Sequence, residues 1–194
     1  EIKSRIDYLT GGTAEGTLLS GVDFSALEKD IEKNPYIDNA EVYTDQTHRI
    51  VAQIIQRRPI MRVINSDGVS YYVGEKNERI PLHHTFTPHV IVALGNVELH
   101  TDTKRDSTVR NALFNLVNYI RSDDFLNAAI DQVVVLPSNE FDLIPRVGNH
   151  VIHFGWPADD VAGKFNRLKT FYKEGLTKVG WEKYKAINLK FDGQ

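Results

Sequence analysis

The sequence predicts an α+β fold in two successive units, and three features indicate it. Residues 1–58 contain two segments of helical periodicity followed by two strand-like segments. Residues 59–194 are dominated by short apolar segments of strand length, separated by turn signals. Segments of helical periodicity interrupt these strands. We therefore expect a helix-helix-strand-strand unit over 1–58, then a mainly antiparallel β domain with two or more covering helices over 59–194.

Two helices are expected in the first unit. One covers residues 1–9 and is followed by a glycine-rich loop at 11–17. The other begins at Asp23 or Ser25, since both residue types cap helices, and ends before Pro35, because the residue preceding a proline avoids helical geometry. The apolar stripe of this second helix is Phe24, Leu27 and Ile31. Strands over 40–43 and 49–58, joined by a polar turn at 44–47, complete the unit.

In the second unit, the turn Ser66-Asp67-Gly68 predicts a hairpin of strands 60–64 and 69–73. Two helices are expected at 107–121 and 158–173, each with one apolar face. The remaining expected strands are 80–82, 90–94, 130–136, 141–144, 150–154 and 184–191.

Composition excludes several classes of protein. With 23 basic and 26 acidic residues the net charge is −3, which argues against a general nucleic-acid binder. The absence of cysteine excludes a disulfide framework and a thiolate metal site. No apolar segment approaches the length of about 18 residues that a membrane span needs. Because the chain begins at Glu1 without a methionine, we expect it to be a fragment of a longer protein.

The histidines His83, His84 and His89 are the best metal candidate, and with them a metal-dependent hydrolase is one hypothesis. Zinc needs three or four converging donors, whereas adjacent side chains on an extended chain diverge. A solvated loop is the simpler interpretation. His150 and His153 are three residues apart on a strand and so face opposite sides.

Other patterns typical of enzymes have simpler explanations. The Gly11-to-Gly16 spacing resembles a phosphate-binding loop but lacks the required lysine. The pairs Asp123-Asp124 and Asp159-Asp160 could be acid–base pairs, but Asp159 stands where a helix begins and helix capping explains it better. We therefore expect no catalysis, no metal and no cofactor.

The last predicted strand is the most informative feature of the C-terminal region. Residues 186–191 alternate apolar and polar side chains shortly before Gln194. A terminal strand at a sheet edge exposes unpaired main-chain groups that a partner strand can complete. A neighbouring strand or loop covering that edge is the alternative.

Several segments together resemble the FtsQ/DivIB family of bacterial cell-division proteins. These are Asn34–Val42, Gln56–Val63, Tyr71–Val73, Ile80–Leu82 and Ala186–Phe191. The first is similar to the signature of the family's POTRA domain, the second to the junction with its β domain, and the last to its final strand. Gly74 and Asn77 depart from the family pattern, although asparagine still tolerates the left-handed conformation of a turn. The first strand of a complete POTRA unit is also missing.

The resemblance implies a non-enzymatic scaffold of the division complex: a single-pass protein of the cell inner membrane whose bulk, including this fragment, lies in the periplasm. It implies binding to coiled-coil partners of the FtsB and FtsL type, and through them to the septal wall synthase FtsW/FtsI. By position, the implied partner-binding residues are Tyr184, Ile187, Leu189, Lys190 and Phe191. Arg57, Arg58 and Pro59 correspond to the interdomain junction. The alternative is a POTRA-bearing component of outer-membrane assembly or secretion machinery.

Overall fold

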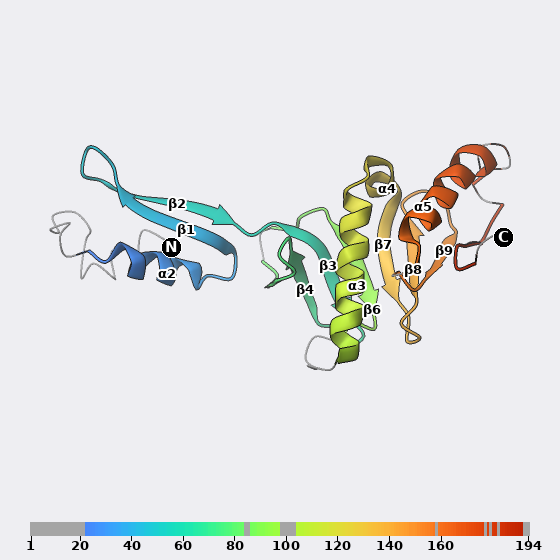
Figure 1. Cartoon of the computed structure of the whole chain (residues 1–194), viewed down its shortest axis with the longest axis horizontal. Coiled ribbons are helices and arrows are strands. Elements are labelled where there is room, and N and C mark those ends of the chain that lie inside the picture. The colour runs from blue at the N-terminus through green and yellow to red at the C-terminus, as the bar shows by residue number, and fades with distance from the viewer. Residues whose placement is uncertain are drawn as a thin grey trace. The chain divides into compact units, whose positions relative to one another are not determined.

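The structure, a computed structural model, describes residues 22–83, 86–97, 104–157, 159–176, 178, 180–181 and 183–191. The chain divides into two compact units, Glu1–Arg58 and Pro59–Gln194 (Figure 1). The helix expected at 1–9 and the loop expected at 11–17 lie outside the described residues.

In the first unit, helix α2 (Phe24–Glu32) begins where the sequence predicts. Asp23 caps it, because its side chain accepts a hydrogen bond from the backbone N–H of Ala26 at 3.0 Å. Strands β1 (Ile37–Thr44) and β2 (Ile50–Gln56) then form an antiparallel hairpin. The core between the helix and the hairpin contains Leu27, Ile31, Ile37, Ala40 and Val42, with Val22, Phe24, Ile50, Ala52 and Ile54 packed against it.

The second unit contains one eight-stranded sheet in the order β10-β9-β8-β7-β6-β3-β4-β5 among the described residues. Its strands are β3 (Pro59–Asn65), β4 (Ser70–Gly74), β5 (Arg79–Ile80), β6 (Ile91–Gly95), β7 (Ile130–Val135), β8 (Phe141–Pro145), β9 (Val151–Gly155) and β10 (Ala186–Asn188). The predicted hairpin around Asp67 is β3–β4.

Four of the seven pairings between neighbouring strands are antiparallel, which confirms the predicted α+β class with a mainly antiparallel sheet. Parallel pairing joins β3 to β6, β6 to β7, and β9 to β10. Parallel neighbours need a long crossover. Helices α3 (Lys104–Arg121) and α4 (Asp124–Ala129) provide it between β6 and β7. Between β9 and β10 it is provided by α5 (Val161–Thr170) and the π-helical turn η2 (Phe171–Leu176).

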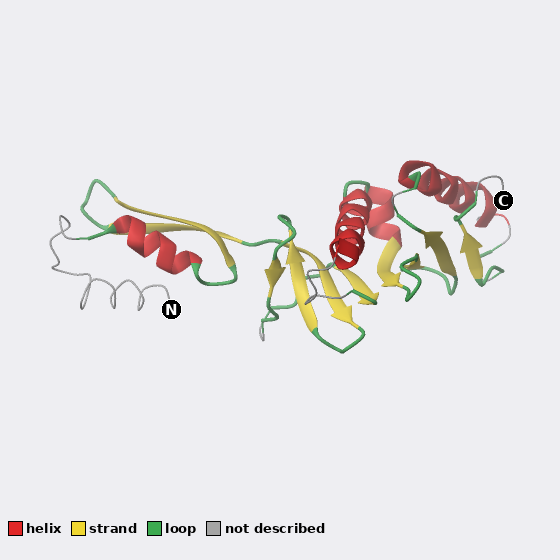
Figure 2. Ribbon diagram, turned by 60° about the horizontal axis from the view of Figure 1, so that its bottom comes forward, coloured by secondary structure: helices red, strands yellow, loops and turns green. Residues whose placement is uncertain are grey.

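Helices α3, α4 and α5 all lie on one side of the sheet (Figure 2). The core between the two layers includes Met61 from β3, Leu113 from α3, Phe154 from β9 and Phe165 from α5, all without exposed surface. The predicted helix at 107–121 is therefore present and buries the expected face.

The second unit differs from the sequence expectation in the helix expected at 158–173, in an additional helix and in the length of the final strand. The helix expected at 158–173 begins at Val161 and changes to π-helical geometry at Phe171. Helix α4 was not expected; Asp123 caps it by accepting from the N–H of Leu126 at 3.0 Å. The final strand, expected over 184–191, pairs with β9 only over Ala186–Asn188.

Gly95, at the end of β6, lies so close to the backbone of the neighbouring parallel strand β7 that only glycine fits there. Its φ is +98°, and a Cβ atom there would lie 2.3 Å from the carbonyl oxygen of Val135 in β7. We expect Gly95→Ala to lower the free energy of unfolding by more than about 2 kcal/mol, through strain and backbone displacement together.

Gly68→Ala is the matched control, because its φ is +78° but a Cβ there has no heavy atom within 4 Å. Gly68→Ala should lower the free energy of unfolding by only about 1 kcal/mol, the cost of placing an alanine at positive φ. Urea denaturation of both variants measures the difference, and equal losses would contradict the role of the Val135 contact.

Candidate functional site

The C-terminal edge, defined here as residues 184–191, contains strand β10. Within the described residues β10 ends the eight-stranded sheet, so the prediction of a C-terminal edge strand is confirmed. The strand runs parallel to β9, with Ala186 opposite Val151 and Asn188 opposite His153. One side of its backbone is thus used inside the protein, and the other faces away from β9.

The hydrogen bonds show which main-chain groups remain on the outer side. The N–H of Val151 donates to the carbonyl of Lys185 at 3.0 Å, and the N–H of Leu189 donates to the carbonyl of His153 at 2.9 Å. Alternate residues of a strand direct their main-chain groups to opposite sides. The N–H and carbonyl groups of Ala186 and Asn188 therefore point toward the open edge, where a further strand can pair.

The side chains of the edge alternate in the same way. Ile187 and Leu189 are only 8% and 5% exposed and belong to the core of the second unit. Tyr184 is half-buried, with its ring packed edge-on against Phe171 at 5.3 Å between centroids. Phe191, in contrast, is 58% exposed. Of the five residues that the sequence implies for partner binding, Phe191 alone presents a large apolar side chain to solvent.

Lys190 already has an acidic neighbour within the chain. Its Nζ donates to Oε2 of Glu140 at 2.6 Å, and this hydrogen bond lowers the pKa of the Glu140 carboxyl below its ordinary value. The lysine stem crosses Gly155 at the end of β9, where a Cβ atom would lie 3.1 Å from Lys190 Cγ. A partner carboxylate that paired with Lys190 would therefore have to compete with this internal ion pair.

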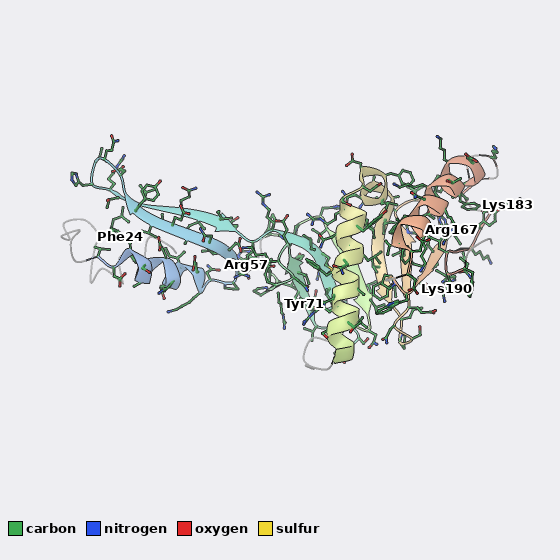
Figure 3. All side chains as sticks on the ribbon, viewed as in Figure 1. Phe24, Arg57, Tyr71, Arg167, Lys183 and Lys190 are labelled. Atoms are coloured by element: carbon green, nitrogen blue, oxygen red, sulfur yellow. The ribbon has the colours of Figure 1, made fainter. Side chains whose placement is uncertain are left out.

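Two further contacts fix the end of the strand. The side-chain oxygen of Asn188 accepts from the N–H of Lys190 at 3.0 Å, which turns the chain away from strand geometry. Arg167 of α5, labelled in Figure 3, donates to the carbonyl of Leu189 at 3.4 Å. It also pairs with Asp160, the cap of that helix, at the same distance.

Sequence reasoning missed Glu140, Gly155 and Arg167 as supports of this edge. They come from the start of β8, the end of β9 and helix α5, and no local pattern connects them to β10. The inward direction of Ile187 and Leu189 could have been found, because the apolar positions of an alternating strand face the core.

A buried histidine packs beneath the segment that leads into β10. His150 is 2% exposed, and its Nε2 lies 2.7 Å from the hydroxyl of Tyr172 in η2. Its ring also packs against Trp181, with 6.4 Å between centroids, and Trp181 in turn packs edge-on against Tyr172. Burial lowers the pKa of His150 below its ordinary 6.5. The imidazole is therefore mainly uncharged at pH 7, where it packs with Tyr172 and Trp181.

The other candidates from the sequence are not brought together within the part of the chain that the structure describes. His83 and His89 are exposed, His84 lies outside the described residues, and the part of the chain that the structure describes contains no group of three or more metal-binding side chains. His150 and His153 do face different partners, as expected: His153 lies 2.9 Å from Asp142. Asp160 rather than Asp159 caps α5, in the same way as Asp23 caps α2 and Asp123 caps α4.

The residues expected at the interdomain junction lie on either side of the division between the units. Arg57 belongs to the first unit, where its N–H donates to the carbonyl of Tyr36 at 2.9 Å and its Nε to that of Ile37 at 3.0 Å. Arg58 is exposed, and Pro59 opens β3 in the second unit.

Comparison with known proteins identifies the second unit. A family model described as "FtsQ/DivIB, C-terminal related" matches residues 58–194. The chain belongs to this FtsQ/DivIB-related family. The resemblance stated from the sequence is thereby confirmed, and family membership supports a role in cell division. No curated protein matches the chain.

The family match covers the second unit and the single residue before it, so the POTRA interpretation of residues 1–58 stays a prediction. Among the helices of the described residues, none is both long and apolar enough to cross a membrane.

The burial of His150 predicts a pH dependence of stability for this FtsQ/DivIB-related chain. Because its folded-state pKa lies below 6.5, the unfolded chain binds the proton more readily. Its contribution is fully present above pH 6.5 and declines as the pH falls from 6.5 toward the folded-state pKa, with a slope no steeper than about 1.4 kcal/mol per pH unit.

Urea denaturation at pH values between 7.5 and about 5 measures this slope. This pH interval lies above the range where the Glu140 carboxyl titrates. The double variant His150→Phe/Tyr172→Phe removes the titrating ring and leaves no hydroxyl without its partner. It should show a shallower slope than the wild type, and an unchanged slope would contradict the assignment to His150.

Proposed function

We propose that the chain is a non-enzymatic scaffold of the division complex and binds its partner by strand addition at the C-terminal edge. The observation that carries the proposal is the open side of β10, where the main-chain groups of Ala186 and Asn188 point away from β9. Membership of an FtsQ/DivIB-related family supplies the cellular context, cell division.

Strand addition requires free main-chain groups and side chains that recognise the partner, and different residues of this edge provide the two. Main-chain hydrogen bonds provide affinity that tolerates sequence variation, and side chains at alternate positions provide specificity. Ile187 and Leu189 hold β10 on the core, so they position the strand rather than touch the partner. Phe191, exposed just beyond the strand, is the side chain best suited to anchor the partner.

The short length of β10 limits what main-chain pairing alone can contribute. Three paired residues offer few hydrogen bonds, each worth about 0.5–1.5 kcal/mol net. A partner that binds tightly therefore has to contact the flanking aromatic side chains as well. This favours a partner with an extended segment next to a second element, as in a coiled-coil protein whose end continues as a strand.

The partners that fit this proposal are coiled-coil division proteins of the FtsB and FtsL type, linked through them to the septal synthase FtsW/FtsI. In this proposal the fragment lies in the periplasm and is held at the inner membrane by a span preceding Glu1. The family match over residues 58–194 favours this role over a POTRA-bearing component of outer-membrane assembly or secretion machinery.

A proline at Asn188 tests the mechanism directly. Proline is tolerated on an edge strand when its missing N–H would face outward, as that of Asn188 does. We expect Asn188→Pro to weaken binding to the extracytoplasmic part of an FtsB-type partner about tenfold or more, measured by calorimetric titration, because a partner carbonyl loses its donor and the ring obstructs pairing.

Asn188→Ala is the control, since it also loses the side-chain hydrogen bond to Lys190 but keeps the main-chain N–H. It should bind within about threefold of the wild type, and equal affinities of the two variants would overturn strand addition. Leu189→Pro is a poorer test, because the Leu189 N–H bonds to His153 within the sheet and its loss would disturb the fold.

A further inference from the structure

The hairpin of the first unit has two outer edges, and one of them is closed by side chains. The backbone N–H of Val42 donates to Glu28 Oε1 at 2.9 Å, and that of Ala40 donates to Glu32 Oε1 at 3.1 Å. Both donors lie on β1, and both acceptors come from α2. Two glutamates of one helix therefore occupy donors that a neighbouring strand would otherwise use.

The spacing of residues along one face of α2 matches the spacing of the outward N–H groups along β1. Residues four apart on a helix lie on one face, about 6 Å apart along the axis. Residues two apart on a strand direct their N–H groups to the same side, about 6.7 Å apart. Glu28 and Glu32 thus reach alternate N–H groups of β1, the nearer pairs being Glu32 with Ala40 and Glu28 with Val42.

These N–H groups belong to the outer edge of β1. In the antiparallel register, Ala40 lies opposite Ile54 and Val42 opposite Ala52. Since both N–H groups bond to α2 instead of β2, they point away from the hairpin. Within residues 22–58 the sheet has two strands, so this is the side on which a further strand would add.

A second copy of β1 fits this edge through two-fold symmetry. Antiparallel pairing of a strand with itself is self-complementary, and β1 is eight residues long. A register centred on Val42 pairs Val42 with Val42 of the second copy, and Ala40 with Thr44 of the second copy. It places Glu41 opposite Tyr43 of the second copy, whereas a register centred on Glu41 would set two carboxylates against each other.

We propose that Glu28 and Glu32 keep the β1 edge closed against this pairing with a second copy of the chain. In the Val42-centred register, each Val42 N–H must donate to the other copy's Val42 carbonyl, and Glu28 already holds that donor. The carboxylates also stand where the carbonyl oxygens of an arriving strand would lie, so the two negative groups repel. Natural sheets commonly block their edges with charged side chains.

The test removes both carboxylates in the complete chain. Glu28→Ala/Glu32→Ala should self-associate, with an average mass by sedimentation equilibrium that rises with concentration from 22.0 kDa toward twice that value. Glu28→Gln/Glu32→Gln should stay at the mass of the monomer, because the amide oxygen can still accept from Ala40 and Val42. The wild type should also be monomeric.

Glu41→Ala controls for the loss of a carboxylate near the edge, because Glu41 is exposed on β1 and the edge donors Ala40 and Val42 bond to Glu32 and Glu28 instead. It should remain monomeric. A double alanine variant that stays monomeric with a wild-type circular dichroism spectrum would overturn the proposal.

Hydrogen exchange of the wild type keeps the proposal testable if the double alanine variant fails to fold. The amides of Ala40 and Val42 should exchange at least tenfold more slowly than in the unfolded chain, since each is bonded to a glutamate. Exchange at the rate of the unfolded chain would overturn the proposal. Association of Glu41→Ala would equally overturn it, because charge loss alone would then explain self-association.

Discussion

Parallel pairing of β10 with β9 is the constraint on which the C-terminal half of the structure depends. The pairing seats Ile187 and Leu189 in the core and fixes which main-chain groups remain on the outer side. It also requires a long crossover, which α5 and η2 provide while covering one face of the sheet. The position of α5 and η2 on the sheet and the outward direction of main-chain groups of β10 are therefore both consequences of the pairing between β9 and β10.

The edge is held from several sides by side chains that local sequence does not connect. Lys190 passes over Gly155 to reach Glu140, and Arg167 reaches the carbonyl of Leu189. The aromatic cluster around His150 packs beneath the preceding segment. A strand of three residues would pair weakly by itself, so these contacts are what holds the short terminal segment against the sheet.

The two units differ in whether the outer main-chain groups of an edge strand are bonded within the chain. In the second unit, the outer main-chain groups of Ala186 and Asn188 face away from the sheet, whereas in the first unit Glu28 and Glu32 occupy the donors of β1. An open edge invites pairing, and a carboxylate-blocked edge resists it. The outer donors of β1 are therefore occupied within the chain, whereas those of β10 face away from its sheet.

Periodicity and capping by themselves determined much of this protein. The Phe24–Ile31 stripe gave α2, the Ser66-Asp67-Gly68 turn gave the β3–β4 hairpin, and the alternation in 186–191 gave a terminal edge strand, since each depends on residues close in sequence. The family resemblance likewise came from ordered local motifs. Tertiary structure alone decided the parallel partners of β6 and β10, the internal pairing of Lys190 with Glu140 and the blocking of β1 by α2. These depend on which distant segments become neighbours, and local pattern carries no information about that choice.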